Sequence, residues 1–304
     1  MEADKVWAVK VLLAGGTGFL GSALVRALRL RGHGVTVLSR TPKGPGEALW
    51  SANASDPSLQ ARVDGADAVI NLAGSSIAAG RWTQARRNTI LRSRVDATRA
   101  LASAITAAAH PPPVFLSGSA VGYYGVQEDA PLDEASPAGA DFLAGVCVEW
   151  EANAMTAAAQ SRVVLLRTGL VLDRNGGALP AIARPFRWGV GGPLGPGRQY
   201  MSWIYLHDWV GLVLWALERE QVVGPLNVTA PAPVTNNEFS RVLANQLHRP
   251  AILRAPAPAL RLILGEMADA LLLGGQRVLP RKAEAEGFTF RFGHLAPVLH
   301  ALYG

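Results

Sequence analysis

Short apolar runs alternate with longer amphipathic stretches along the chain before about residue 170. Short runs bounded by glycine, proline or polar residues are typical of buried strands, and apolar residues three and four positions apart are typical of helices. The pattern predicts strands over 9–14, 35–38, 66–74, 114–117 and 162–167, and helices from 20 to the glycines at 32–34, over 83–109 and over 140–160. This alternation predicts an α/β fold, a Rossmann-type doubly wound parallel sheet with helices on both faces.

The first strand runs directly into a glycine-rich turn, Gly15–Gly21. Gly15 allows the tight exit, Gly18 leaves room for a phosphate beside the backbone, and Gly21 lets the next helix lie close to the strand. A strand, a glycine turn and a helix start together present unpaired backbone N–H groups to a pyrophosphate. The turn therefore predicts a nicotinamide dinucleotide site, and the alternative is a structural turn that binds no nucleotide.

The residues after the second strand bear on which dinucleotide is bound. An acidic residue there would bind the ribose hydroxyls of NAD and repel a 2′-phosphate. This chain instead has Ser39, Arg40 and Thr41, followed by Lys43. A guanidinium, an ammonium and two hydroxyls suit a phosphate dianion, so we predict NADP(H) in preference to NAD(H). The alternative is a solvated basic loop.

Several later segments are predicted to be connections. Residues 42–57, rich in Gly, Pro, Ser and Ala, are expected to form a surface connection, and residues 189–197 are expected to form a long glycine and proline loop.

His207 and Asp208 precede a helix that runs to Leu217. We expect them to cap that helix, with the Asp208 charge favourable near its N-terminus.

The last part of the chain predicts a second, smaller unit. Helices are expected near 235–247 and 256–273, with an extended piece at 251–253 between them. We therefore predict a dinucleotide-binding domain over 1–225 and a small α+β domain over 226–304 that covers the substrate side of the sheet. Ligands of doubly wound sheets bind beyond the carboxyl ends of the strands, so the cleft is expected there.

Composition limits the classes of function. With 49% hydrophobic and 17% charged residues among 304, the chain is long and apolar enough to bury a large core. Its formal charge of +6 comes from scattered arginines, which indicates a mild preference for anionic small molecules and no nucleic-acid surface. The histidines are scattered and the chain has one cysteine, so we expect no metal site.

The single cysteine and the chain's amino-terminal residues indicate a compartment. Cys147 cannot form an internal disulfide, and its apolar neighbours favour a buried core residue over a nucleophile. Residues 1–5 carry charges and do not resemble a signal peptide, and no apolar run is long enough to span a bilayer. We expect a cytoplasmic protein that is not attached to a membrane, as a monomer or a homodimer.

Several motifs together carry a resemblance to a known family. The glycine turn, Asn71–Gly74 and Leu116–Val121 resemble the extended short-chain dehydrogenase/reductase superfamily, in its nucleotide-sugar epimerase-like branch. The chain is most similar to a subgroup of poorly characterised epimerase family proteins with a small C-terminal domain of the DUF1731 type. The stretches that resemble this subgroup are Gly80–Trp82, Ser93–Val95, Ser119–Gly125, Arg167–Gly169, Gly191–Gly195, Trp203–Tyr205, Asn227–Pro231 and Leu279–Phe288.

The resemblance implies a set of site residues. Ser119 lies where the family places its substrate-orienting hydroxyl. Ser119 and Tyr124 are therefore the candidate catalytic residues, with Tyr124 a candidate for acid/base chemistry. The alternative for Tyr123 and Tyr124 is aromatic packing around the nucleotide. The substrate cleft is expected to include Arg81, Trp82, Arg94, Tyr123, Arg198 and Trp203. The expected cofactor-binding residues are Gly15, Thr17, Gly18, Phe19, Leu20, Ser39, Arg40, Thr41, Asn71, Leu72, Ala73, Gly74, Ser117 and Arg167.

The chain departs from the family at its catalytic pair. Extended reductases and epimerases use a Tyr-x-x-x-Lys pair, in which the lysine lowers the tyrosine pKa so that the phenolate can accept a proton. Aligning the helix on Glu151 places the tyrosine position at Leu143 and the lysine position at Cys147. Neither residue can do that chemistry. Two hypotheses follow: an NADP-dependent oxidoreductase or epimerase with altered acid/base groups, or an NADPH-binding regulatory or partner-binding protein without catalysis.

Overall fold

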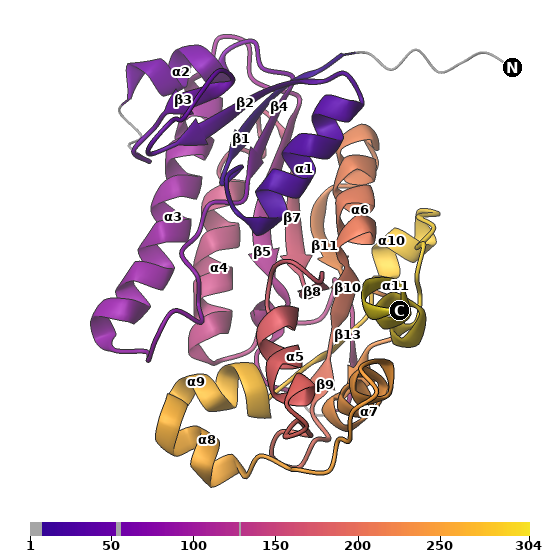
Figure 1. Ribbon diagram of the computed structural model, residues 1–304. Helices are drawn as coiled ribbons and strands as arrows, with labels where there is room; N and C mark the ends of the chain where they lie inside the picture. Colours follow the sequence, from indigo (N-terminus) through magenta and orange to yellow (C-terminus); the bar gives the residue numbers. More distant parts are fainter. Residues whose placement is uncertain (1–7, 53–55, 128) are drawn as a thin grey trace, which may run out of the picture.

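A seven-stranded parallel sheet forms the centre of the protein in the computed structural model, which describes residues 8–52, 56–127 and 129–304 (Figure 1). Residues 1–5, expected to carry no signal peptide, lie outside these ranges. The strands of the sheet are β1 (Lys10–Ala14), β2 (Gly34–Ser39), β3 (Glu47–Leu49), β4 (Ala68–Asn71), β5 (Val114–Ala120), β7 (Arg162–Thr168) and β11 (Gly224–Val228). Their order is β11-β7-β5-β4-β1-β2-β3, so the predicted doubly wound sheet is confirmed.

Helices cover both faces of the sheet because successive strand residues point to opposite sides. The helices are α1 (Phe19–Leu30), α2 (Pro57–Val63), α3 (Gln84–Ala107), α4 (Phe142–Met155) and α6 (Leu206–Glu218). Leu13 of β1 packs with α1 and α6, whereas Leu12 packs with α2, α3 and α4.

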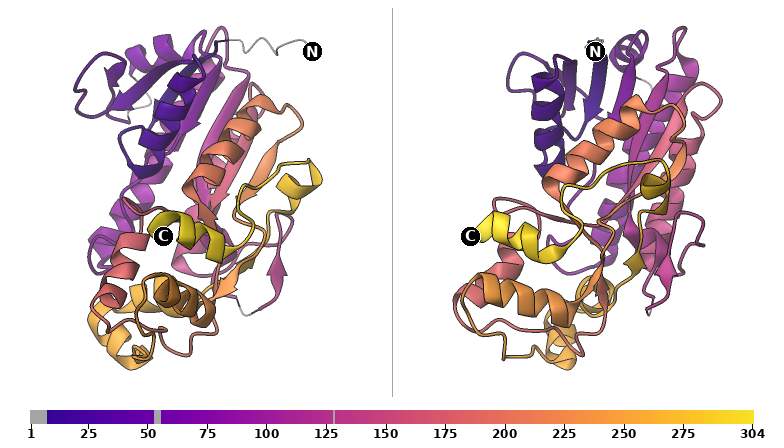
Figure 2. Two further views of the ribbon diagram at one scale, coloured as in Figure 1. Left: turned by 45° about the vertical axis from the view of Figure 1, so that its right-hand side comes forward. Right: turned by 90° about the vertical axis from the view of Figure 1, so that its right-hand side faces the viewer.

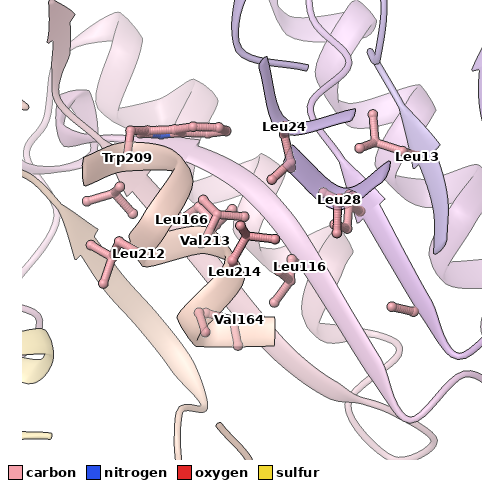
Figure 3. Packing of buried hydrophobic residues seen from close by; sticks show 14 of the residues in the cluster. Leu13, Leu24, Leu28, Leu116, Val164, Leu166, Trp209, Leu212, Val213 and Leu214 are labelled. Carbon is pink, nitrogen blue, oxygen red and sulfur yellow. The ribbon is translucent and has the colours of Figure 1, made fainter. Parts of the chain in front are cut away.

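The packing of α1 and α6 shows how the first face is held (Figure 3). Leu24 and Leu28 of α1 and Trp209 of α6 are fully buried over Leu116 and Leu166 of the sheet. Burying each of these leucine side chains stabilises the fold by about 1.5–3 kcal/mol. Leu24 and Leu28 therefore hold α1, which follows the glycine turn, against the sheet.

Of the other elements, α10 lies beside the start of β11, and most of the rest lie beyond the carboxyl ends of the strands (Figures 1 and 2). Three small sheets there join distant segments, because β10 pairs with β8, β12 with β9, and β13 with β6. These elements are β6 (Pro131–Leu132), β8 (Leu170–Leu172), β9 (Tyr200–Met201), β10 (Trp203–Tyr205), β12 (Val234–Thr235), β13 (Arg277–Val278), α5 (Leu179–Arg187), α7 (Asn236–Gln246), α8 (Ala257–Leu264), α9 (Glu266–Ala268), α10 (Arg281–Ala285) and α11 (Leu295–Tyr303).

Two connections differ from the prediction. The surface connection expected over 42–57 contains β3, which pairs with β2 because Ala48 and Trp50 alternate inward and are buried. The single helix expected over 256–273 is interrupted at Gly265, whose φ of 64° is unfavourable for residues with a side chain and ends α8.

One cap differs from the prediction although Asp208 does lie in the first turn of its helix, and one strand crosses the limit expected between the two domains. Tyr205, not Asp208, is the N-cap of α6, and the Asp208 carboxylate accepts hydrogen bonds from the backbone N–H groups of Arg291 and Phe292. The predicted limit between 225 and 226 falls inside β11, because that strand continues the sheet to Val228. No helix of the described ranges is both long and apolar enough to cross a membrane.

Candidate functional site

A cavity of about 790 Å³ opens at the carboxyl ends of β1, β2 and β4. From β1 the chain winds to one side through β2 and β3, and from β4 it continues to the other side, so this crevice is the switch point of the sheet. A cavity of this size lies within the range of cofactor and ligand sites. Nine of the predicted cofactor residues line it: Gly15, Thr17, Gly18, Ser39, Arg40, Thr41, Leu72, Ala73 and Gly74.

The glycine turn forms the floor of this cavity. Gly15 has a φ of 81°, and a Cβ at Gly21 would lie 2.2 Å from the carbonyl oxygen of Gly15, so a side chain at Gly21 would push α1 away from β1. Gly18 is the N-cap of α1 and makes no side-chain cap hydrogen bond. The backbone N–H groups and positive dipole end of α1 therefore face the cavity, which suits a pyrophosphate.

The basic segment after β2 lies on the same cavity. Arg40 is exposed, and the Thr41 N–H donates to Ser39 Oγ at 3.2 Å, which shapes the turn. Trp50, at the end of β3, also lines the cavity although it was predicted to be in a surface connection. The alternation of Ala48 and Trp50 with polar or exposed neighbours was the signal that could have found it.

One wall of the cavity was missed by sequence reasoning. It consists of α3 residues spaced along one helical face: Asn88, Thr89, Arg92, Ser93 and Asp96. Apolar positions predicted that helix, and its polar stripe one face away was given no role. Polar residues at i, i+4 and i+8 on a helix that also packs on a sheet were the available signal.

The other five predicted cofactor residues do not line the cavity. Phe19 and Leu20 begin α1, and the Asn71 side chain is fully buried, where its amide donates to Thr98 Oγ1 and its carbonyl accepts from the Ala73 N–H. Asn71 thus shapes the exit of β4. Ser117 is fully buried, and Arg167 belongs to a separate polar network.

That network lies within the fold at the carboxyl ends of β5, β7 and β11. Glu151 of α4 accepts two hydrogen bonds of 2.9 Å from Arg167 of β7, one on each oxygen, and a third of 2.6 Å from Ser119 Oγ. Ser119, Glu151 and Arg167 are at most 6% exposed. Although burial lowers the pKa of Arg167, hydrogen bonding and the charge of Glu151 raise it above its usual value.

Tyr124 extends the network toward the C-terminal segment. It is fully buried, and its hydroxyl donates to Asn227 Oδ1 at 2.7 Å and accepts from Arg167 at 3.0 Å. Burial raises the pKa of Tyr124 to about 12. The Arg167 guanidinium also lies 3.4 Å from the centroid of the Tyr123 ring. This arrangement does not favour acid/base chemistry by Tyr124, because no cation lowers its pKa enough to offset burial.

The two positions of the family pair lie one helical turn apart on α4. Leu143 Cβ lies 3.4 Å from where a Cβ at Gly122 would be, which places Leu143 over the exit of β5. Cys147 is buried, its Sγ lies 3.8 Å from the Ala120 oxygen, and burial raises the pKa of its thiol to about 12. Cys147 is therefore a neutral core residue, as predicted, and α4 places no charge at that position.

The predicted cleft residues are not brought together. Trp203 is fully buried in the core formed with α5 and α7, where its indole donates to the Ala232 oxygen, so it does not line a cleft. Arg198 is exposed, and Arg81 is exposed with a hydrogen bond to the Leu262 oxygen. Trp82 is half-buried against Phe142, with ring centroids 5.2 Å apart.

Comparisons with known proteins agree with this geometry. The model of the NAD dependent epimerase/dehydratase family matches residues 11–228, and that of a domain of unknown function (DUF1731) matches residues 255–302. Epimerase family protein SDR39U1 of Mus musculus is 42% identical, over 96% of this chain and 98% of its own length.

Two solved structures are similar along the chain. The crystal structure of human epimerase family protein SDR39U1 with NADPH has a TM-score of 0.90 and 38% identity, over 97% of this chain and 99% of that chain. The nucleoside-diphosphate sugar epimerase of Corynebacterium glutamicum has a TM-score of 0.80 and 32% identity, over 98% of this chain and 59% of that chain.

Proposed function

The chain belongs to the NAD dependent epimerase/dehydratase family, and we propose that it binds NADP(H) in the cavity at the switch point of its sheet. We further propose that it is an epimerase-like oxidoreductase that acts on a small molecule without the Tyr-x-x-x-Lys pair. The similar human protein was crystallised with NADPH, and this chain resembles it from end to end.

One observation carries the choice of NADP(H). Ser39, Arg40 and Thr41 line the same cavity as the glycine turn, at the end of β2, and no carboxylate stands there. A guanidinium and two hydroxyls can bind a 2′-phosphate, whereas NAD would leave the guanidinium without an anion. Gly15 and Gly21 keep the turn tight against the exit of β4 and the start of α1, because a Cβ on either would collide with backbone.

The test is nucleotide binding by Arg40→Ala, measured by calorimetry. Loss of a charge-assisted contact costs about 1.5–3 kcal/mol, so NADPH affinity should fall roughly 10- to 100-fold while NADH affinity changes little. Arg26→Ala is the matched control, because Arg26 is exposed on α1 and does not line the cavity. Equal losses for both nucleotides would contradict the assignment of the 2′-phosphate to Arg40.

NADPH, when bound, supplies a hydride. Among the residues proposed for acid/base chemistry, Ser119 holds a proton that it donates to Glu151, and Tyr124 holds one that it donates to Asn227. Both side chains are buried and a serine hydroxyl is too weak an acid to protonate a substrate, so we propose Ser119 as a hydroxyl that orients the substrate and Tyr124 as a residue that positions Arg167. Full turnover by Ser119→Ala, on any substrate found, would exclude Ser119 from the chemistry.

A second candidate function is nucleotide binding without turnover. Leu143 and the neutral Cys147 favour it, because α4 offers neither a phenol nor an ammonium. Incubation of the NADPH complex with a panel of carbonyl compounds separates the two candidates through the absorbance of the reduced nicotinamide. Tight NADPH binding with unchanged absorbance, together with a defined protein partner recovered by pull-down, would favour the regulatory protein over the enzyme.

A further inference from the structure

Arg94 of α3 is a largely enclosed guanidinium next to the cofactor cavity. Its Nη1 donates to the carbonyl oxygens of Ser75 and Ile90, at 3.1 and 3.0 Å. Its Cζ lies 5.3 Å from the centre of the Trp150 ring and 3.2 Å from where a Cβ at Gly74 would be. Arg94 is therefore held between α3, α4 and the exit of β4.

A second arginine lies two turns earlier on the same helix. Arg86 Nη2 donates to the Ser76 oxygen, the carbonyl that follows the one bound by Arg94, and its buried Nε has no hydrogen-bond partner. The two positive charges are close enough for Arg86 to contribute, after burial, to a lowered pKa of Arg94. The 75–76 loop is thus held by two guanidiniums that repel each other.

Neither guanidinium is neutralised by a carboxylate. The salt bridges within the ranges that the structure describes involve other arginines, and Glu151, the buried carboxylate of α4, is bound on both oxygens by Arg167. Both side chains are only partly exposed, and a charge withdrawn from water is costly unless it is paired, a cost that arginine cannot escape by losing its proton. An anionic ligand would supply the missing charge.

The position of Arg94 connects this charge to the site. Gly74 and Ser75, which contact Arg94, both line the cofactor cavity. On the α4 side, the Arg94 guanidinium lies against the ring of Trp150, about one helical turn after Cys147, the position where the family pair would carry its lysine. The chain thus brings from α3 a positive charge to the region where α4 has none.

We propose that Arg86 and Arg94 bind the anionic group of the substrate, a carboxylate or a phosphate, beside the β4 exit. This proposal rests on the NADP(H)-dependent function proposed above. A guanidinium binds either anion through two parallel N–H groups, and two guanidiniums that bind neighbouring carbonyls of one loop can share one dianion. The substrate would then be a small molecule that carries a carboxylate or phosphate near its reacting carbon.

The test is anion binding to protein already saturated with NADPH, so that the pyrophosphate site is occupied. Inorganic phosphate and oxalate are titrated separately by calorimetry. We expect the natural sequence to bind at least one of them, and Arg94→Gln and Arg86→Gln to lower that affinity by about tenfold or more. The anion that binds more tightly, and loses more in the variants, identifies the group.

Arg99→Gln is the matched control, since Arg99 is exposed on α3 and bonds to Asn153. Its anion affinity and its NADPH affinity should stay unchanged. Arg94→Lys, which keeps the charge, should retain more anion affinity than Arg94→Gln. If Arg94→Gln does not fold, Arg86→Gln tests the proposal in its place.

The proposal is overturned if NADPH-saturated protein binds neither anion, or if the glutamine variants bind as well as the natural sequence. NADPH binding is measured first, on its own. Its absence would remove the proposed function, whereas NADPH binding without anion binding would remove only the role of Arg86 and Arg94.

Discussion

Removing the Glu151 carboxylate should strongly destabilise the fold. Glu151→Gln keeps the shape of the side chain but leaves the Arg167 guanidinium, 3% exposed, without its counter-charge. It also replaces one of the two carboxylate oxygens, which accept hydrogen bonds from Arg167 and Ser119, with an NH2 group, which can only donate. Breaking a buried ion pair from one side costs about 3–5 kcal/mol, a large part of the 5–15 kcal/mol by which proteins of ordinary stability are folded.

The assay is urea denaturation followed by circular dichroism and extrapolated to water. Glu149→Gln is the matched control, because Glu149 is exposed on the same helix and its loss should change the free energy of unfolding by less than about 0.5 kcal/mol. Arg167→Met added to Glu151→Gln should restore part of the loss, because it removes the unpaired charge. A loss below about 1 kcal/mol for Glu151→Gln would refute the reasoning from a desolvated pair.

Three further results are expected from the packing and burial of single residues. Gly21→Ala should destabilise the protein by about 1–3 kcal/mol in the same urea assay, because its Cβ would lie 2.2 Å from the Gly15 oxygen. Gly145→Ala in α4, where a Cβ would meet no atom within 4 Å, should stabilise it by about 0.5–1 kcal/mol. Similar effects of the two substitutions would contradict the packing. Cys147, whose pKa is raised to about 12 by burial, should resist a thiol reagent at neutral pH until the protein is unfolded in denaturant, and rapid reaction of the folded protein would show that it is accessible. Because the pKa of Tyr124 is raised to about 12 in the folded state from 10.0, its contribution to stability is present below about pH 10 and is lost as pH rises from 10 to 12. Tyr124→Phe should therefore show a shallower fall of stability in that window, and an unchanged slope would count against the buried hydroxyl.

The sheet and the cofactor cavity were largely predictable because their signals are local. Each βα unit has a recognisable sequence pattern, a short apolar run followed by apolar residues at helical spacing. The glycine turn has a residue with positive φ and positions where a Cβ would collide with backbone, so glycine is required there. β3 escaped prediction because it has only three residues and lies in a segment rich in glycine and proline, so the short inward alternation of Ala48 and Trp50 was not recognised. Trp50, which follows it, was missed for the same reason.

The buried network was not predictable in its connections. Ser119 and Tyr124 were expected in the site on the strength of a family resemblance, but nothing local indicates that Glu151 would bind Arg167 and Ser119 together. Those partners are 16 and 32 residues from Glu151 in the chain, and they meet only because β5, β7 and α4 pack against one another. Trp203 shows the opposite outcome, since a residue expected in a cleft lies in the core.

Sequence alone determined the parallel sheet, the glycine turn and the basic segment that follows the second strand, and it predicted that Leu143 and Cys147 stand at the positions of the family pair. These features depend on the identity and spacing of neighbouring residues, which the chain carries whether it is folded or not. The tertiary structure decided which charged groups neutralise each other: Arg167 has Glu151, whereas Arg94 and Arg86 have no carboxylate partner among the residues that the structure describes. Charge pairing depends on distances between residues far apart in the chain, and only packing sets those distances.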